Sequence, residues 1–414
     1  MTATTEQPAK TPPAFKLTRG EERRGVVALL ANSGLMSFGF YMLFPLISVH
    51  YTQDIGMTAT VVGVVLAVRQ AIQQGLTIVG GALAERIGYR TTIALGMLVR
   101  SIGFVLIAFA VDLPLLLAGA VVSAIGGALF EATGLAAMAA LTAPAERPRR
   151  YALVTTCGSI GSALGPLIGV ALLRFDFRYV SLAAAGCFFV AFVLSVVLMP
   201  RLPGAGAEAP SFLQTIATVG RDRPFVAFVA FLVGYYVLFT QVFITVPLRA
   251  EAVTGSRESV ALLYAVNSAT LIGLSYVTVR TVSRRFGPVT LLQVGVGLAA
   301  LGLGSYAVAG GLPVLIVGIL GYAFGRMLAE PMIQTVVARA AADQVRAAYF
   351  GFAMLALAVG GSGGQLAGGW LYDLGQATGR PALPWLGCAL TGAVVVGGLA
   401  LWRLNPGGRR LAQR

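Results

Sequence analysis

The sequence predicts an all-α membrane protein in which twelve transmembrane helices form two six-helix bundles of the same orientation. Charged residues make up 11% of the 414 residues and apolar residues 57%, whereas soluble domains average about 25% and 45–50%. The apolar residues come in blocks of about 20, which is long enough for a helix to cross the ~30 Å hydrocarbon layer of a bilayer. The two halves of the chain also match each other at one fixed offset.

The apolar blocks divide into two sets of six. After a polar tail at 1–24 without a cleavable signal pattern, we expect an N-terminal bundle over 25–200. Its helices are expected at approximately 25–49, 60–83, 91–111, 114–142, 151–173 and 179–199. A polar cytoplasmic loop at 201–224 leads to a C-terminal bundle over 225–403 and a tail at 404–414. The helices of this bundle are expected at approximately 225–248, 259–281, 289–309, 312–338, 348–371 and 382–403.

The distribution of basic residues predicts the orientation. Of the 30 lysines and arginines, 22 fall in the two tails and in the loops on the same side as the tails. Cytoplasmic segments of membrane proteins carry the excess of positive charge. We therefore expect both termini in the cytoplasm of a prokaryote, with the chain in the plasma (inner) membrane.

An offset of 199 residues aligns the two halves without a gap. It places Arg86 on Arg285 and Glu131 on Glu330. Five glycine pairs follow the same offset: Gly88 with Gly287, Gly126 with Gly325, Gly161 with Gly360, Gly165 with Gly364 and Gly169 with Gly368. Because six spans separate the copies, the copies share one orientation, as in transporters built from parallel repeats around a midplane site.

Several functions are disfavoured by composition. The net charge of +14 comes from short basic clusters between apolar blocks, and not from the dense basic surface of a nucleic-acid-binding protein. The three cysteines lie in apolar blocks without metal-site spacing, and there is one histidine, His50. A zinc centre or a catalytic triad would need more such groups. We expect no enzyme activity, no cofactor, no metal and no nucleic-acid partner.

The loop between the second and third predicted helices carries a recognisable motif. It runs from Gly81 to Arg90 and reads GALAERIGYR. This stretch resembles the loop signature of the major facilitator superfamily, with Glu85 where an aspartate is more common. The resemblance implies a gate on the cytoplasmic side, formed by Gly81, Glu85, Arg86, Gly88 and Arg90.

The fifth predicted helix contains Gly158, Gly161, Gly165, Pro166 and Gly169. This pattern is similar to the antiporter motif of the drug:proton antiporter branch of that superfamily. Small residues at these spacings let helices pack closely in lipid, and a proline inside a helix removes one hydrogen bond. Close packing alone would also explain the glycines.

Three stretches resemble the MdtH type of multidrug efflux transporter within that branch: residues 39–48, 69–76 and 175–178. The likeness is clearest over residues 32–200. Two positions depart from that type. Asn32 stands where an acidic residue is expected, and 130–133 lacks the Pro-Pro-Arg expected there.

Charged and polar residues inside the predicted helices are the functional candidates, because burying an ionised group in lipid is costly. Arg69, Gln70, Gln73 and Gln74 form one polar face of the second helix, which we expect to bind substrate or to form a structural network. Arg100 is expected to join the third helix to a neighbour. Arg326 and Glu330 are spaced to pair on the tenth helix.

Two acidic residues are candidates for proton coupling, Glu131 and Glu330. Glu131 either pairs with Arg86 to close the cytoplasmic side or carries the proton. Further substrate contacts are expected from polar or aromatic side chains that suit a mixed pocket: Asn32, Tyr41, Tyr235, Tyr236, Gln241 and Asn267.

We therefore predict a secondary active transporter that exports small amphipathic or aromatic compounds in exchange for protons, by alternating access. The expected partners are a small-molecule substrate, protons and the lipid bilayer, and the expected state is a monomer. Three alternatives stay open: an exporter or flippase for an endogenous metabolite or lipid-linked compound, a proton symporter for uptake, and a membrane sensor or scaffold without transport.

Overall fold

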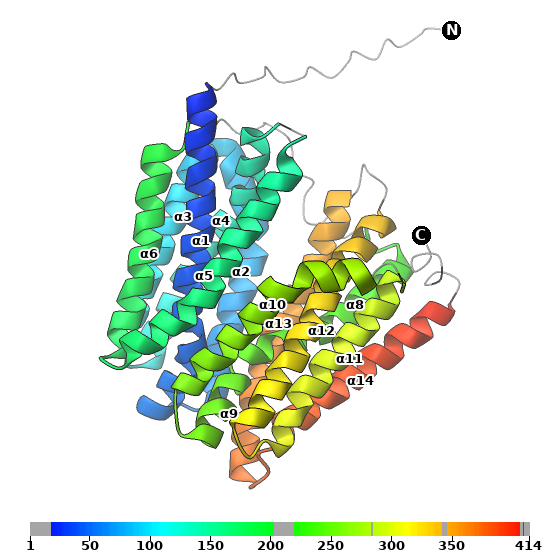
Figure 1. Ribbon diagram of the computed structural model, residues 1–414. Helices are drawn as coiled ribbons and strands as arrows, with labels where there is room; N and C mark the ends of the chain where they lie inside the picture. Colours follow the sequence, from blue (N-terminus) through cyan, green and yellow to red (C-terminus); the bar gives the residue numbers. More distant parts are fainter. Residues whose placement is uncertain are drawn as a thin grey trace.

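A computed structural model describes residues 18–143, 145–202, 219–282, 285–341, 346–405 and 409, and in these ranges the secondary structure is helical (Figure 1). The first half contains α1 (Arg19–Val49, continued by a π-helical turn to Asp54), α2 (Ala59–Ile87), α3 (Tyr89–Ala108), α4 (Leu113–Leu141), α5 (Arg147–Leu173) and α6 (Phe177–Leu198). Most of the predicted tails, 1–24 and 404–414, and of the predicted loop, 201–224, lies outside the described residues.

The first helix begins six residues before its predicted start. Thr18 and Glu21 form a capping box, in which the Thr18 hydroxyl accepts from the Glu21 amide at 3.3 Å and the Glu21 carboxylate accepts from the Thr18 amide at 2.9 Å. Such a box satisfies two amide groups that a helix start leaves without partners. The cap therefore extends α1 into polar sequence that hydropathy excludes.

The second half contains α8 (Arg223–Thr240), α9 (Thr245–Thr254), α10 (Glu258–Val282), α11 (Pro288–Gly304), α12 (Leu312–Ala340), α13 (Arg346–Ala377) and α14 (Leu383–Leu404). The helix predicted at 225–248 is interrupted: a short 3₁₀ turn, Gln241–Phe243, and a non-helical Ile244 separate α8 from α9. Pro247 accounts for the break, because it has no amide to donate to residue 243 and its ring disfavours a continuous helix there.

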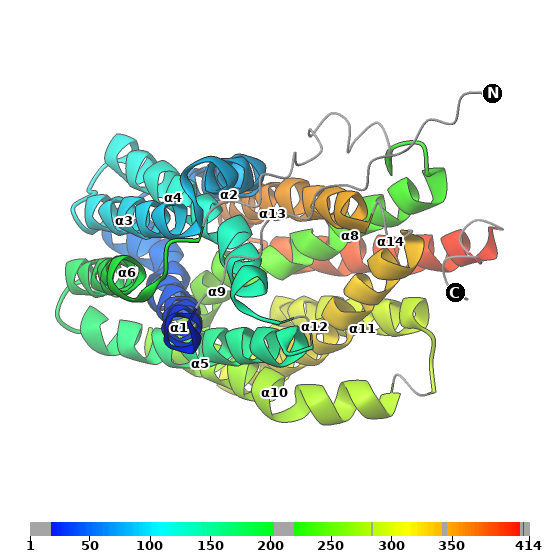
Figure 2. The same cartoon turned by 90° about the horizontal axis from the view of Figure 1, so that it is seen from above.

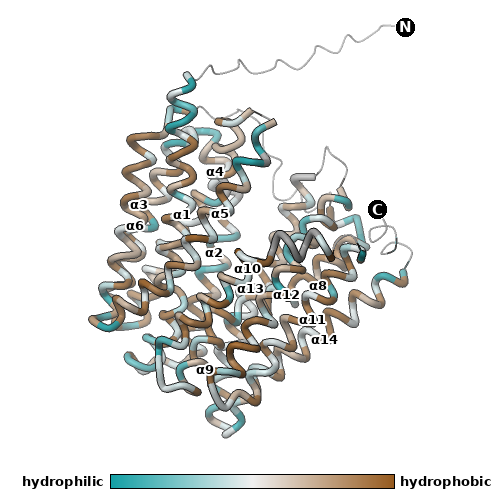
Figure 3. The backbone as a smooth tube through the Cα atoms, viewed as in Figure 1, coloured by the Kyte–Doolittle hydropathy of each residue, from teal (hydrophilic) through white to brown (hydrophobic). Residues whose placement is uncertain are grey.

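Eleven helices in the described residues are long and apolar enough to cross a membrane. The remaining predicted helix, at 259–281, corresponds to α10, which has 25 residues, but its described apolar part, Glu258–Leu274, is shorter than a full span. Large apolar side chains point outward from the bundle, among them Val197 at 70% exposed and Leu301 at 71%. Figure 3 shows apolar residues along the helices and polar residues mainly at the two ends. These outer surfaces fit lipid and not water.

The predicted repeat is present in the packing. Helices α1 and α5 pack together as α8 and α13 do, and α3 and α4 pack together as α11 and α12 do. A Cβ atom added to Gly165 would lie 2.7 Å from the Phe38 carbonyl oxygen, and one added to Gly364 would lie 2.8 Å from that of Val237. Phe38 and Val237 are themselves 199 positions apart. The glycines of the motif on α5 therefore serve the same close helix contact as their counterparts on α13.

The two halves meet mainly through α2 against α13 and α5 against α10. The 199-residue offset maps α2 onto α10 and α5 onto α13, so it converts one of these pairs into the other. The two halves are therefore related by an approximate twofold axis. We call the side with Arg19 and Leu404 the terminal side and the side with α9 the distal side. The halves lie side by side at the distal side and apart at the terminal side (Figure 1). Seen from above, α2 lies beside α13 and α5 beside α10 (Figure 2).

The glycine contacts give a stability prediction. Gly161→Ala should lower the melting temperature of the purified protein, because the added Cβ would lie 2.7 Å from the Phe38 amide nitrogen of α1 and overpacking costs about 1–3 kcal/mol. Gly186→Ala on α6 is the control, since nothing lies within 4 Å of its added Cβ. There the better helix propensity of alanine should raise stability by up to about 1 kcal/mol. Equal effects of the two substitutions would contradict this account of the α1–α5 contact.

Candidate functional site

A cavity of about 380 Å³ lies between the two halves. Most of its lining comes from α1, α2, α3 and α4, and the second half contributes Phe239, Phe243 and Leu357. Its wall combines several aromatic rings with a few charged and amide groups, a composition typical of small-molecule sites. The first-half side chains in the wall are Leu29, Ser33, Met36, Ser37, Phe40, Tyr41, Arg69, Gln70, Gln73, Gln74, Arg100, Phe130, Glu131, Leu135 and Val154.

The predicted polar face of α2 lies in this cavity. Arg69 donates to the Gln73 side-chain oxygen at 2.7 Å and to that of Gln70 at 2.9 Å. Only 3% of Arg69 is exposed, and its guanidinium carbon lies 4.5 Å from the centre of the Phe44 ring. Hydrogen bonds and the ring face together hold this charge in place. The polar face of α2 is therefore both a hydrogen-bonded network and part of the cavity wall.

Arg100 also reaches the cavity, although the sequence suggested a role in joining α3 to a neighbouring helix. Its side chain is 2% exposed and lies near three aromatic rings, at 5.1 Å from that of Phe188, 5.7 Å from Phe40 and 5.9 Å from Phe104. The Arg100 side chain passes over α4 at Gly127, where an added Cβ would overlap the Arg100 Nη1 atom. A missing side chain on α4 thus lets a charge on α3 enter the cavity.

The two arginines are incompletely satisfied. Within the described part of the chain, the Nε of Arg69 and the Nε and Nη1 of Arg100 are buried without a hydrogen-bond partner. A buried donor without a partner costs about 1–3 kcal/mol, and more when it is charged. Each buried donor without a partner calls for an explanation, and a place in the wall of a binding cavity is one.

Glu131 faces the cavity and is solvent-exposed within it. Its carboxylate accepts a hydrogen bond from the Gln73 Nε2 at 3.1 Å, and among the described residues it makes no ion pair at salt-bridge distance. Arg69 and Arg100 both interact with it electrostatically. An ionised Glu131 offsets one of these two positive charges. A neutral Glu131 would leave both uncompensated.

The matching acid of the second half has a different partner. Glu330 accepts from the Arg326 Nε at 2.6 Å, which confirms the predicted pair on one face of α12. The Arg326 guanidinium lies 4.8 Å from the centre of the Phe239 ring. The repeat thus gives each half an acid at the same position, directly paired with an arginine in one half and hydrogen-bonded to a neutral glutamine in the other.

Five of the predicted substrate contacts do not line this cavity: Asn32, Tyr235, Tyr236, Gln241 and Asn267. Asn32 is fully buried and donates to the Ser195 hydroxyl at 2.7 Å, which joins α1 to α6. Gln241 donates to the Gly364 carbonyl at 2.9 Å, which joins the end of α8 to α13. The chemistry of Asn32 and Gln241 suits a mixed pocket, but their helices turn both side chains toward neighbouring helices. Tyr41 and the α2 face do line the cavity.

The lining that the sequence analysis missed follows a helical period. Leu29, Ser33, Met36, Ser37 and Phe40 recur on α1 at spacings of three, four and one residues, which is one helix face. Most of these residues are apolar, so a search for polar groups passes over them. Phe130, Phe239 and Phe243 also line the cavity. They are aromatic, but nothing local in the sequence shows which helix faces meet the cavity.

The predicted gate residues lie at the turn between α2 and α3. Gly88 has φ 86° and ψ 154°, a conformation that favours glycine. The Tyr89 hydroxyl donates to the Glu85 carboxylate at 3.0 Å, Arg90 donates to the Val196 carbonyl, and Arg86 is exposed. The glycine makes a tight turn, and the charges lie where the terminal side would close.

Comparison with known proteins identifies the class. Residues 29–365 match the family model of the Major Facilitator Superfamily, so the chain belongs to this family of membrane transporters and is a transporter rather than an enzyme. A crystal structure of a POT family transporter in complex with a thioalcohol-conjugated peptide superposes with a TM-score of 0.79 at 13% identity, covering 92% of this chain and 96% of that one. At that identity the likeness shows the fold alone.

Named relatives narrow the class further. The multidrug resistance protein MdtH of Sodalis glossinidius (strain morsitans) is 39% identical over 375 residues, which are 91% of this chain and 92% of that protein. MdtH of Yersinia pestis (strain Pestoides F) is 36% identical over 381 residues, or 92% and 94% of the two chains. The resemblance inferred from the motifs is confirmed, and it extends over both halves.

The two arginines give a second prediction. Arg100→Met should leave the melting temperature unchanged or raise it, because it removes a buried charge with two unpartnered donors and replacement of buried charge by apolar groups is often stabilising. Arg69→Met should lower it, since it breaks two hydrogen bonds worth about 1.5–3 kcal/mol each. Thermal unfolding of the purified variants measures both. Destabilisation by Arg100→Met of the same size would contradict the idea that Arg100 is retained for function.

Proposed function

We propose that this protein exports small amphipathic or aromatic compounds across the plasma (inner) membrane of a prokaryote in exchange for protons. The observation that carries the proposal is the cavity wall, in which aromatic rings surround one exposed acid, Glu131. Burial of apolar surface attracts flat apolar molecules without a directional requirement, and aromatic rings offer faces and edges for stacking. The names of the MdtH relatives, multidrug resistance proteins, support the same assignment.

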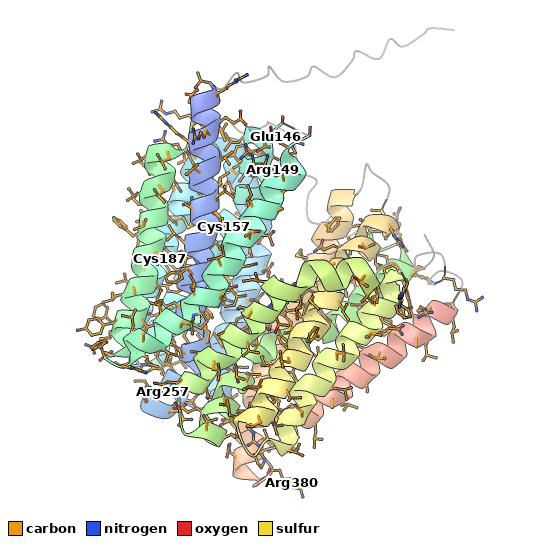
Figure 4. All side chains as sticks on the ribbon, viewed as in Figure 1. Glu146, Arg149, Cys157, Cys187, Arg257 and Arg380 are labelled. Atoms are coloured by element: carbon orange, nitrogen blue, oxygen red, sulfur yellow. The ribbon has the colours of Figure 1, made fainter. Side chains whose placement is uncertain are left out.

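The proposed orientation places the terminal side in the cytoplasm. Arg149 lies at the terminal side, and Arg257 and Arg380 lie at the distal side (Figure 4). In the sequence, 22 of the 30 basic residues fall in the tails and in the loops on the same side as the tails, in agreement with the excess of positive charge on cytoplasmic loops. In this orientation the two halves are apart at the cytoplasmic side. A compound from the cell interior would therefore enter the space between the halves in this conformation.

Proton coupling is assigned to Glu131. A coupling group must bind its proton with different affinity in the two orientations of the transporter, because a group with no such difference cannot drive exchange. Glu131 meets two requirements of this role, since it is exposed in the cavity and its hydrogen-bond partner is a neutral glutamine. Glu330 is held by Arg326. In the other orientation the second half would close against the cytoplasmic end of the cavity and change the surroundings of Glu131, which supplies the required difference in proton affinity.

The coupling assignment is tested with a matched pair of variants. Glu131→Gln should abolish proton exchange, because the amide cannot release a proton. Glu330→Gln should retain most of the exchange. Everted vesicles acidified by respiration are loaded with a pH-sensitive dye, and the loss of the gradient is followed on addition of toxic aromatic compounds to which the wild type confers resistance. Full exchange by the Glu131 variant would move the coupling to Glu330, Asp54 or His50, and uptake of a nutrient in place of export would contradict the proposed direction.

The gate makes a separate prediction. Arg86→Ala should slow turnover about tenfold while substrate affinity in the inward-open state changes less than twofold, because Arg86 is exposed and does not line the cavity. A tenfold change in rate corresponds to about 1.4 kcal/mol, the size of one charged hydrogen bond. Initial transport rates and equilibrium binding on the same preparation separate the two quantities. Unchanged turnover in a correctly inserted variant would rule out a role of Arg86 in the gate.

A further inference from the structure

The start of α2 has an unusual cap. A helix start leaves its first amides without partners inside the helix. The Thr58 hydroxyl accepts from the Val61 amide, which leaves the amides of Ala59 and Thr60. Both donate to the carboxylate of Asp373, at 3.0 and 2.7 Å, and the Thr60 hydroxyl donates to the same group at 2.5 Å. Asp373 belongs to α13, in the other half of the protein.

Elsewhere aspartate caps are local. Asp112, Asp176 and Asp222 accept from amides two or three residues further along their own helices. Asp373 is more than 300 positions away from α2. In the part of the chain that the structure describes, it is the aspartate whose capping bonds cross from one half to the other. The cap therefore exists only while the halves are together at the distal side.

The backbones of α2 and α13 are close enough for this cap because glycines line their contact. A Cβ added to Gly63 of α2 would lie 2.6 Å from the Gln365 carbonyl oxygen. One added to Gly369 of α13 would overlap the Ala59 carbonyl oxygen and lie 3.1 Å from the Thr60 Cα. Gly369 is one turn before Asp373. The same contact thus seals the distal end and positions the carboxylate at the first turn of α2.

Two ion pairs also cross from one half to the other at the distal side. Arg174 and Glu258 form an ion pair between the halves with 70% and 64% of their side chains exposed, and exposed pairs of this kind contribute about 0–1 kcal/mol. Arg257 pairs with Asp54, and this hydrogen bond raises the pKa of the Arg257 guanidinium. Asp373 is half-buried, accepts three hydrogen bonds and meets the positive end of the α2 dipole.

We propose that Asp373 is the residue that holds the distal side closed, by capping α2 from the opposite half. The transition to the outward-open state then requires this carboxylate to leave the α2 amides, which water would solvate instead. Asp373 acts as a positioning residue for the conformational equilibrium, whatever compound is carried and whether or not protons are exchanged.

The test measures the ratio of the two conformations without substrate or proton gradient. Spin labels replace Arg149 and Arg403, which are exposed at the terminal side in opposite halves, in full-length protein with its three cysteines changed to serine. Pulsed electron resonance gives the distance distribution. The short distance corresponds to the conformation with the terminal side closed, and the long distance to the conformation with it open. Asp373→Asn should increase the ratio of short to long distances about tenfold, because this is the equivalent of one charged hydrogen bond. Glu258→Gln is the control and should change it less than twofold.

A second variant guards against a fold defect. Gly369→Ala keeps the carboxylate but forces α13 away from α2 at the cap, so it should shift the ratio in the same direction as Asp373→Asn. If Asp373 merely stabilised the fold, its substitution would lower the melting temperature without changing the ratio of the two conformations. A ratio within twofold of the wild type for Asp373→Asn in folded protein would overturn the proposal. Because no transport is measured, failure of proton-coupled export would leave this result unaffected.

Discussion

Close backbone contact between helices is the constraint on which the rest of this structure depends. Lipid is as apolar as a leucine side chain, so transmembrane helices gain little from burying apolar surface against each other and rely on tight packing. Glycines supply that packing here between α1 and α5, between α8 and α13, and across the halves between α2 and α13. Each half becomes a rigid bundle, and the contact between halves is limited to a few helix pairs. A rigid pair of bundles with a limited interface can change orientation as two bodies.

The same use of glycine brings charge into the membrane interior. Gly127 leaves the space that the Arg100 guanidinium occupies, and the ring faces around it partly replace the water that the charge has lost. Arg69 finds glutamine oxygens, yet the two arginines together retain three unpartnered nitrogens. A fold selected for stability alone would replace such a cluster with apolar residues. Its presence in the cavity wall argues for a role in binding or coupling.

The two halves share a backbone plan and differ in chemistry. Glu131 and Glu330 occupy equivalent positions. The cations Arg69 and Arg100 of the first half have no counterpart in the second, where the uncharged residues Ser268 and Ala299 stand at the matching positions. The repeat therefore provides symmetry for the movement, and substitution in one copy provides an asymmetric cavity. The distal cap by Asp373 adds a directional contact to the same symmetric frame.

The sequence by itself determined the membrane class, the approximate helix positions apart from the break at 241–244, the parallel repeat and the polar face of α2, because hydropathy, helical period and the 199-residue offset are properties of local sequence. It also indicated the family through one loop and one helix. Only the tertiary structure decided which residues share a cavity. Asn32 and Gln241 turned to neighbouring helices, Arg100 entered through the gap at Gly127, and Asp373 met α2. These outcomes depend on helix rotation and on contacts between residues far apart in the chain, which no local pattern encodes.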